Sequence, residues 1–143
     1  AGVSARTYYL AGRRNDACAF CSPQVEGGIL KMDCVFCKIA SGEIPSKKAY
    51  EDDKICAFYD LDPQAPVHIL IIPKEHIASA REITPENSGI VAHIFEVAAK
   101  LAEENHLDNG FRIVNNCGED GGQTVQHLHF HLLGGRSMKW PPG

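Results

Sequence analysis

The chain has 143 residues, of which 44% are hydrophobic, and this suits one domain with a single core. The formal net charge is −4 with Lys and Arg scattered, so no basic surface for nucleic acid is evident. The longest apolar run, Val67 to Pro73, is far shorter than the roughly 20 residues of a membrane-spanning helix, so we expect a soluble protein without nucleic-acid or membrane partners.

The first 31 residues differ in character from the rest of the chain. They show no clear periodicity and no continuous apolar run before a small-residue cleavage site, so a secretory signal is not expected. We predict an N-terminal extension over residues 1–31, disordered or non-native, and one domain over residues 32–143. Six cysteines in a chain without a signal favour metal ligands or reduced thiols, which predicts a cytoplasmic location.

The remaining chain predicts short strands around one long helix. Residues 35–45 favour a helical turn that stops near Ser41 and Gly42, and residues 47–53 and 54–61 favour a hairpin that turns at Asp52 and Asp53. Residues 65–73 predict a strand buried on both faces. Thr84 and Pro85 predict the start of a helix that runs to about His106 with one apolar stripe. Strands are expected over 111–115 and 123–133, so the fold class is α+β with a mainly antiparallel sheet.

The last of these strands carries three histidines at every second position, in the segment "QHLHFHLL". Side chains alternate between the two faces of a strand, so His127, His129 and His131 are expected to share one face and line an open surface. The intervening Leu128, Phe130 and Leu132 are expected to pack on the helix.

Two chemistries could use this row of imidazoles. The first is metal ligation, with a further ligand from elsewhere in the chain. The second is nucleophilic attack on phosphorus, because a neutral imidazole is available near pH 7. The preceding segment "GEDGGQTV", residues 118–125, favours the second: its glycines let backbone amides approach an anionic phosphate, although such turns also simply join strands.

These residues resemble the histidine triad (HIT) superfamily. The resemblance covers about residues 33–143 and extends to "IPSKKAYEDD", "AFYDLDPQAPVHILIIPKEHI", "VNNCGEDGGQTVQHLHFHLLGGR" and "MKWPPG". Together these segments resemble the Hint branch, the purine nucleoside phosphoramidases. It implies an antiparallel sheet of about five strands with one long helix, and a homodimer whose two sheets join into one.

The resemblance also implies a role for each site residue. His129 would attack the α-phosphorus, His131 would assist protonation of the leaving group, and His127 and His68 would form an outer relay. Asp60 would bind the ribose hydroxyls. The remaining substrate contacts would be the phosphate turn (Asn116, Gly122, Gln123, Thr124), an apolar purine slot (Phe36, Ile39, Ile44, Phe58, Leu61) and Trp140 on the leaving-group side, either within one chain or across the dimer.

Cys34 and Cys37 have the spacing of zinc ligands, but a complete site needs two more. Some bacterial members of the family bind zinc at this place, which here implies Cys34, Cys37, His76 and His127. Alternatively, both thiols are free and packed in the core. A third reading pairs Cys18 and Cys21 with Cys34 and Cys37 in a zinc ribbon.

The function expected from the resemblance is hydrolysis of purine nucleoside 5′-phosphoramidates, such as adenylated lysine, to the nucleoside monophosphate through a nucleotidyl-histidine. No cofactor would be required for the chemistry, and any zinc would be structural. The alternatives are a nucleotide-binding scaffold with incidental turnover, a dinucleoside polyphosphate hydrolase, and a zinc-dependent hydrolase that uses the histidine row as ligands.

Overall fold

The computed structural model describes residues 33–143, with one short helix, three strands, a long helix and two further strands in chain order. The elements are α1 (Val35–Ser41), β1 (Lys48–Glu51), β2 (Ile55–Tyr59), β3 (Val67–Pro73), a 3₁₀ turn η1 (Ala80–Glu82), α2 (Gly89–Glu104), β4 (Phe111–Val114) and β5 (Phe130–Gly134). The predicted extension over residues 1–31, with Cys18 and Cys21, lies outside the described residues, as does Met32.

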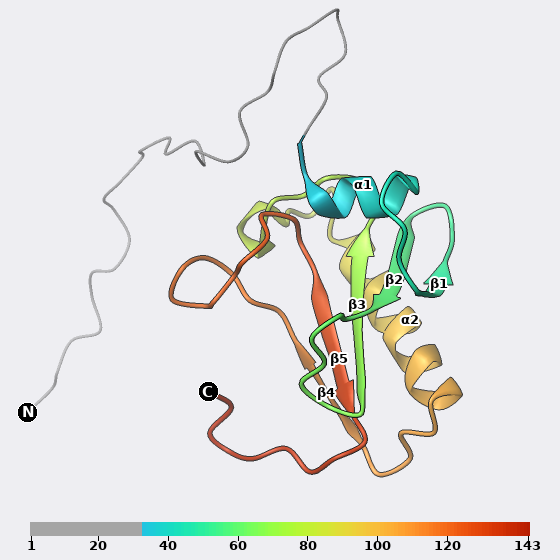
Figure 1. Cartoon of the computed structure of the whole chain (residues 1–143). Helices are drawn as coiled ribbons and strands as arrows, with labels where there is room; N and C mark the ends of the chain where they lie inside the picture. Colours follow the sequence, from blue (N-terminus) through green and yellow to red (C-terminus); the bar gives the residue numbers. More distant parts are fainter. Residues whose placement is uncertain (1–32) are drawn as a thin grey trace, which may run out of the picture.

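The five strands form one antiparallel sheet in the order β1-β2-β3-β5-β4. The predicted hairpin is confirmed, and its turn is stabilised by the carboxylate of Asp52, which accepts hydrogen bonds from the amides of Lys54 (2.8 Å) and Ile55 (2.7 Å). The predicted α+β fold class is therefore confirmed. Figure 1 shows α2 behind the sheet and α1 across the end at which β3 stops.

The two faces of the sheet pack against different helices because side chains alternate along each strand. The larger cluster lies between the sheet and α2, and it contains the three apolar residues of the histidine row, Leu128, Phe130 and Leu132. The smaller cluster lies under α1. Its buried members are Cys34, Phe36, Ile39, Ala40, Cys56, Phe58, Leu70 and Ile72.

The long helix α2 begins later than the sequence predicted. Its first residue is Gly89 rather than Pro85, because the amides of Ile90 (3.1 Å) and Val91 (3.0 Å) bond to carbonyls only three residues back, at Asn87 and Ser88. The preceding turn does begin at Thr84, whose amide donates to the Asn87 side chain (2.7 Å) as in a capping box, while Asn87 donates to the carbonyl of Glu82 (2.9 Å). The apolar stripe is confirmed, with Ile94, Val97, Ala98, Leu101 and Ala102 buried. Among residues 33–143, no helix is long and apolar enough to cross a membrane.

The predicted last strand is much shorter than expected. It was predicted over residues 123–133, but β5 begins only at Phe130, which pairs with Ile71 of β3. The residues before it bond to other parts of the chain: the amide of Leu128 donates to the carbonyl of Ile77 over 2.6 Å. His127 and His129 therefore stand just before the sheet ladder and not within it.

Candidate functional site

The three imidazoles of the row lie on the α1 side of the molecule, as their alternation with apolar residues predicts. The rings of His129 and His131 meet edge to face, 5.1 Å between centroids, and the ring of Phe36 from α1 lies 5.1 Å from that of His129. The expectation of an open surface is wrong for two of the three, because His127 is fully buried and His129 is 3% exposed. Only His131 is partly exposed.

Backbone carbonyls determine which nitrogen of His129 carries the proton. Its Nδ1 lies 2.6 Å from the carbonyl oxygen of His127, and a carbonyl oxygen can only accept. Nδ1 therefore donates, and a neutral His129 keeps its lone pair on Nε2. A lone pair on Nε2 is what a nucleophilic imidazole needs.

His131 has the opposite orientation because of a chain of hydrogen bonds that begins at a backbone amide. The amide of Gln64 donates to Nδ1 of His68 (3.0 Å), so Nε2 of His68 carries the proton and donates to Nδ1 of His131 (2.9 Å). The proton of a neutral His131 must then sit on its Nε2. That atom is buried and has no hydrogen-bond partner among residues 33–143. It is a donor that a bound ligand could satisfy.

The pKa of His131 is lowered to about 4, chiefly by burial and then by the neighbouring His129 and His68, while Asp60 acts in the opposite direction. The pKa of His68 is lowered as well, chiefly by burial, although Asp60 acts in the opposite direction. The carboxylate of Asp60 lies 3.5 Å from Nε2 of His68. At pH 7 both rings are neutral, so the tautomers described above are the forms present.

A second cluster joins Cys34 and Cys37 from α1 to His76 and His127. Their ligand atoms all lie within 4.8 Å of one another, and Nδ1 of His127 is 3.5 Å from each sulfur. Nδ1 of His76 lies 3.3 Å from the sulfur of Cys37. Ligands of a tetrahedral zinc ion with ordinary Zn–S and Zn–N bonds are about 3.5 Å apart. The cluster therefore fits a structural zinc ion.

The ring of His127 is also oriented as a metal ligand. Its Nε2 donates to the carbonyl of Pro73 over 2.8 Å, so the lone pair lies on Nδ1 and faces the sulfurs. The predicted relay role of this ring needs correction, because both of its nitrogens face away from His129. What reaches His129 is the backbone carbonyl of His127.

A third group of possible ligands, Asp60, His68 and His131, is close enough to hold a metal but is arranged for hydrogen bonding. The amide of Gln64 already uses the Nδ1 lone pair of His68, so Nε2 carries a proton where a metal would need a lone pair. A metal bound at Nε2 would have to replace this proton, which would then sit on Nδ1 and leave the Gln64 amide without its acceptor. This disfavours the group of Asp60, His68 and His131 as a ligand set.

The glycine-rich turn over residues 118–125 agrees with the prediction at its glycines but not at Gln123. Gly122 has φ +73°, and a Cβ on Gly121 would come within 2.4 Å of the carbonyl oxygen of Cys117, so both positions need glycine. The side chain of Gln123 was predicted to contact phosphate, but the turn itself uses it. It donates to the carbonyls of Ala78 (2.8 Å) and Val125 (3.0 Å) and accepts from the amide of Gly118 (3.0 Å).

The other predicted turn residues remain available for a ligand. Asn116 is half-buried and Thr124 is exposed. Sequence reasoning missed the neighbouring Asn115, whose amide nitrogen donates to the carbonyl of His129 over 2.8 Å. The repeated "NN" just after a strand was the only available signal. Asn115 holds the backbone of the central histidine from the β4 side.

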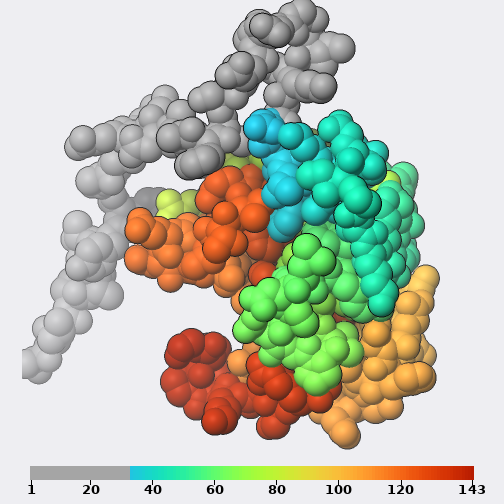
Figure 2. Space-filling model, in the orientation of Figure 1, coloured from blue at the N-terminus to red at the C-terminus, as the bar shows by residue number. Residues whose placement is uncertain are grey.

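The predicted purine slot is gathered in one place, with one exception. Phe36, Ile39 and Phe58 belong to the buried cluster under α1, and Ile44 packs against it. Leu61 stands apart and is fully exposed. Figure 2 shows a hollow on this face, bordered by the green segment that carries Asp60 and by the orange-red segment that leads into the histidine row.

The C-terminal segment with Trp140 is not brought to the histidines within one chain. Trp140 is 83% exposed, and the guanidinium of Arg112 donates to the carbonyl of Lys139 over 2.9 Å. Figure 1 shows the C-terminus at the opposite end of the sheet from α1. Trp140 therefore does not reach the histidines within one chain, and its place on the leaving-group side across the dimer stays a prediction.

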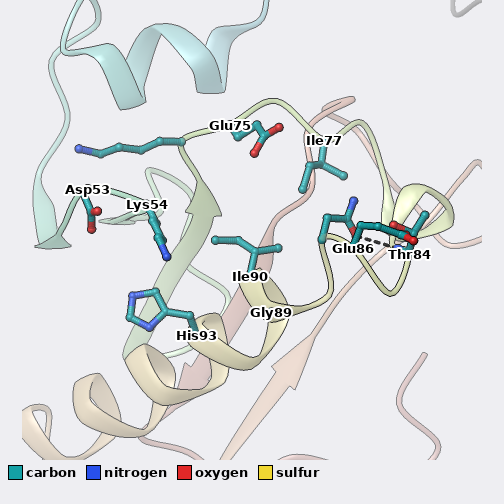
Figure 3. Close-up of a pocket in the computed structure, with 11 residues that line it drawn as sticks. Asp53, Lys54, Glu75, Ile77, Thr84, Glu86, Gly89, Ile90 and His93 are labelled. Carbon is teal, nitrogen blue, oxygen red and sulfur yellow. Dashed lines mark hydrogen bonds between the residues drawn. The ribbon is translucent and has the colours of Figure 1, made fainter.

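A cleft of about 670 Å³ lies elsewhere, between the β1–β2 turn and the start of α2. Figure 3 shows Lys54 from the turn and His93 from α2 at this cleft, with Ile77 and Ile90 between the flanking segments. None of the predicted site residues lines it. Beside the cleft, Nε2 of His93 lies 2.6 Å from the Asp52 carboxylate and Nδ1 lies 3.1 Å from that of Glu96. This geometry favours a protonated His93.

We expect His93→Gln to destabilise the protein by about 1 kcal/mol, and only in a limited pH range. The hydrogen bond to Asp52, followed by that to Glu96, raises the pKa of His93, so its contribution is complete below about pH 6.5 and is lost as pH rises through the raised pKa. Burial would raise the pKa of Asp52, but hydrogen bonds from His93 and other donors outweigh it and lower that pKa. The contribution from Asp52 is therefore lost as pH falls below about 4.

Urea unfolding across pH 4–9 tests this expectation. The stability difference between His93→Gln and the unmodified protein should be greatest near pH 5 and should shrink at high pH. His106→Asn is the control, because His106 is an exposed histidine just beyond the end of the same helix. A difference that does not change with pH would contradict the charged state that we assign to His93.

Comparison with known proteins places the chain among related sequences and folds. A family model described as "Scavenger mRNA decapping enzyme C-term binding" matches residues 33–140. The chain is 51% identical over 111 residues to an uncharacterized HIT-like protein of Synechococcus elongatus, covering 78% of this chain and 97% of the relative. It is 48% identical over 113 residues to a 14 kDa zinc-binding protein of Brassica juncea, covering 78% of this chain and 100% of the relative.

The fold has close counterparts among solved structures. The crystal structure of a HIT family hydrolase from Legionella pneumophila matches with a TM-score of 0.77 and 52% sequence identity. The match covers 78% of this chain and 100% of that chain.

Proposed function

The chain belongs to the histidine triad superfamily, and on this premise we propose that it hydrolyses purine nucleoside 5′-phosphoramidates to the nucleoside monophosphate. Its similarity to a HIT family hydrolase supports a hydrolytic reaction in general. The finer assignment, to the Hint branch, draws support from the orientation of two neighbouring imidazoles. His129 offers a lone pair on Nε2, and His131 beside it offers an unpartnered Nε2–H.

The proposed reaction has two steps. In the first, Nε2 of His129 forms a bond to the α-phosphorus while the bond from phosphorus to the amine breaks. The amine takes up the Nε2 proton of His131, whose ring gains a second proton from solvent when substrate binds and is left neutral by the transfer. In the second, water attacks the same phosphorus, the bond to His129 breaks, and the proton of the water returns to His131. The net reaction consumes one water and releases the amine and the nucleoside monophosphate.

A bound phosphate would assist this proton transfer. Burial keeps His131 neutral in the free protein, with a pKa lowered to about 4. An anionic phosphoryl group beside Nε2 would raise that pKa, because an opposite charge favours the protonated ring. His68, fixed by the Gln64 amide, would hold His131 in the productive orientation. Binding of the substrate would thus help to protonate His131.

The remaining contacts are proposals that follow from the resemblance. Asp60 would accept hydrogen bonds from the ribose hydroxyls, and the apolar residues under α1 would receive the purine. Asn116, Gly122 and Thr124 would contact the phosphate. Gln123 would contribute indirectly by bracing the turn, since its side chain already makes three hydrogen bonds there.

We also propose that the working form is a cytoplasmic homodimer built from the domain over residues 32–143, without nucleic-acid or membrane partners. The strand order leaves β4 at an edge of the sheet, where a second copy could add its own β4. Phe111 on that edge is 44% exposed. A dimer of this kind would place one C-terminal segment near the site of the other copy, which would give the exposed Trp140 a role.

Covalent trapping tests the proposed reaction most directly. The protein is mixed with an adenosine 5′-phosphoramidate of an alkylamine and quenched in alkaline denaturant, because a phosphorus bond to histidine is labile in acid. Mass spectrometry of the digested protein should find a nucleotidyl group on the peptide that contains His129. Turnover without any labelled histidine would contradict a covalent mechanism.

A further inference from the structure

The nucleophile that we propose is not held by the sheet. The ladder between β3 and β5 begins with the pair Ile71 and Phe130, so His129 stands one residue before it. A catalytic group needs to be held in place to within a fraction of an ångström, and a strand ladder would usually do this. Other contacts must therefore fix His129.

Three hydrogen bonds tie the segment from 127 to 129 to β3, to the residues that follow β3 and to the residue just after β4. The amide of Leu128 donates to the carbonyl of Ile77 (2.6 Å), and the side chain of Asn115 donates to the carbonyl of His129 (2.8 Å). The ring of His127 donates to the carbonyl of Pro73 (2.8 Å). Two of these three acceptors, Pro73 at the end of β3 and Ile77 after it, flank His76, one of the candidate zinc ligands.

The zinc cluster joins the same parts of the chain. Cys34 and Cys37 come from α1, His76 from the segment after β3, and His127 from the segment before β5. Between the two cysteines in α1 stands Phe36, whose ring lies 5.1 Å from the ring of His129 and 6.0 Å from that of His127. Two contacts of the His129 ring therefore come from the cluster region. One is the ring of Phe36, which stands between the two cysteines, and the other is the carbonyl of His127, itself a member of the cluster.

We propose that the metal centre formed by Cys34, Cys37, His76 and His127 positions the nucleophile His129. A bound zinc ion supplies only a cross-link here. The residues of the chain do the rest: with the ring of His127 fixed, its carbonyl is fixed as the acceptor for Nδ1–H of His129, and Nε2 points toward the substrate. This inference rests on the proposed function for the role of His129, but the positioning itself can be measured without substrate.

The alternative is that zinc stabilises the whole domain and does nothing specific at His129. Amide hydrogen exchange separates the two. A general loss of stability would speed exchange in α2 and in the central strands as much as at the site. Loss of positioning would speed amide exchange mainly at Leu128 and His129. It would also change the tautomer of the His129 ring, which is measured by the ¹⁵N chemical shifts of the ring nitrogens.

The experiment compares zinc-loaded full chain with the same protein after removal of metal by a chelator. We expect exchange of the Leu128 amide to be at least about tenfold faster in the metal-free form, with α2 amides changed much less. With an adenosine phosphoramidate, we expect kcat to fall by about ten- to a hundredfold and KM to stay within about twofold. Re-addition of zinc should restore both.

Cys37→Ser should lose stoichiometric zinc and behave like the chelated protein, whereas Cys117→Ser, outside the cluster, should keep it. Cobalt added in place of zinc should give the absorption of thiolate ligands only while Cys34 and Cys37 are present. If Cys37→Ser does not fold, amide exchange in the unmodified protein with and without zinc still tests the inference. The inference is overturned if no metal binds, if exchange at Leu128 is unchanged, or if all amides change equally. Exchange that changes at Leu128 in a protein without phosphoramidase activity would support positioning and reject the proposed substrate.

Discussion

His129→Ala is expected to lower kcat for adenosine phosphoramidates by at least about 10⁴-fold while leaving affinity for AMP within about threefold. The reason is that the change removes the only atom that forms the covalent bond in the proposed reaction. Affinity for AMP should change little because other residues build the phosphate turn and the apolar cluster under α1, of which Phe36 contacts the ring. Single-turnover kinetics and equilibrium titration with AMP measure the two effects separately.

The control must exclude loss of folding, because His129 is 3% exposed and its ring packs against Phe36. His129→Asn is the matched variant, since an amide nitrogen can still donate toward the carbonyl of His127 while offering no nucleophile. Both variants should be inactive, and the asparagine variant should unfold closer to the unmodified protein. Residual turnover above about one per cent in a folded His129→Asn would show that another group attacks phosphorus.

His131→Gln is expected to cause a loss that depends on the leaving group. With an alkylamine as leaving group we expect kcat/KM to fall by about 10²- to 10⁴-fold, because an amine leaves phosphorus poorly unless it is protonated. With a nitrophenolate ester of AMP we expect a fall of about tenfold or less, because this group departs as a stable anion. The ratio of the two losses measures the proton transfer.

The structural basis for this expectation is the direction of the hydrogen bonds. The chain from the Gln64 amide through His68 forces the proton of His131 onto Nε2, where no residue in the range 33–143 accepts it. Gln64→Ala is a suitable control, because it keeps the backbone amide that donates to His68 and should leave the ratio unchanged. Equal losses with both substrates in His131→Gln would mean that this ring only binds phosphate.

Much of the architecture followed from local patterns. The acidic pair at Asp52 and Asp53 predicted the hairpin, and the apolar stripe of α2 predicted which side of that helix is buried. Both depend on neighbours a few residues away, where the physics of turns and periodicity applies directly. The start of α2 was predicted too early because the amides of Ile90 and Val91 bond to carbonyls three residues back, and Thr84 and Pro85 do not distinguish such a turn from an α-helix.

In the site, too, some features followed from local sequence patterns and others did not. Alternation along "QHLHFHLL" determined that the imidazoles face one side and Leu128, Phe130 and Leu132 the other, and this held even where the strand itself did not form. Cysteine spacing determined that two thiols could share a metal. The sequence alone could suggest His76 and His127 only through a family resemblance.

Only the tertiary structure decided what each imidazole does. The ring of His127 bonds to Pro73, which lies 54 residues away, and the ring of His131 bonds to His68, which lies 63 residues away. A neutral imidazole has one donor and one acceptor, and the partner that it meets determines which nitrogen is which. Such partners come together only when the sheet forms. The sequence by itself therefore determined which residues could carry the chemistry, while folding decided which ring has its lone pair on Nε2, which has an unpartnered Nε2–H and which faces the two cysteine sulfurs.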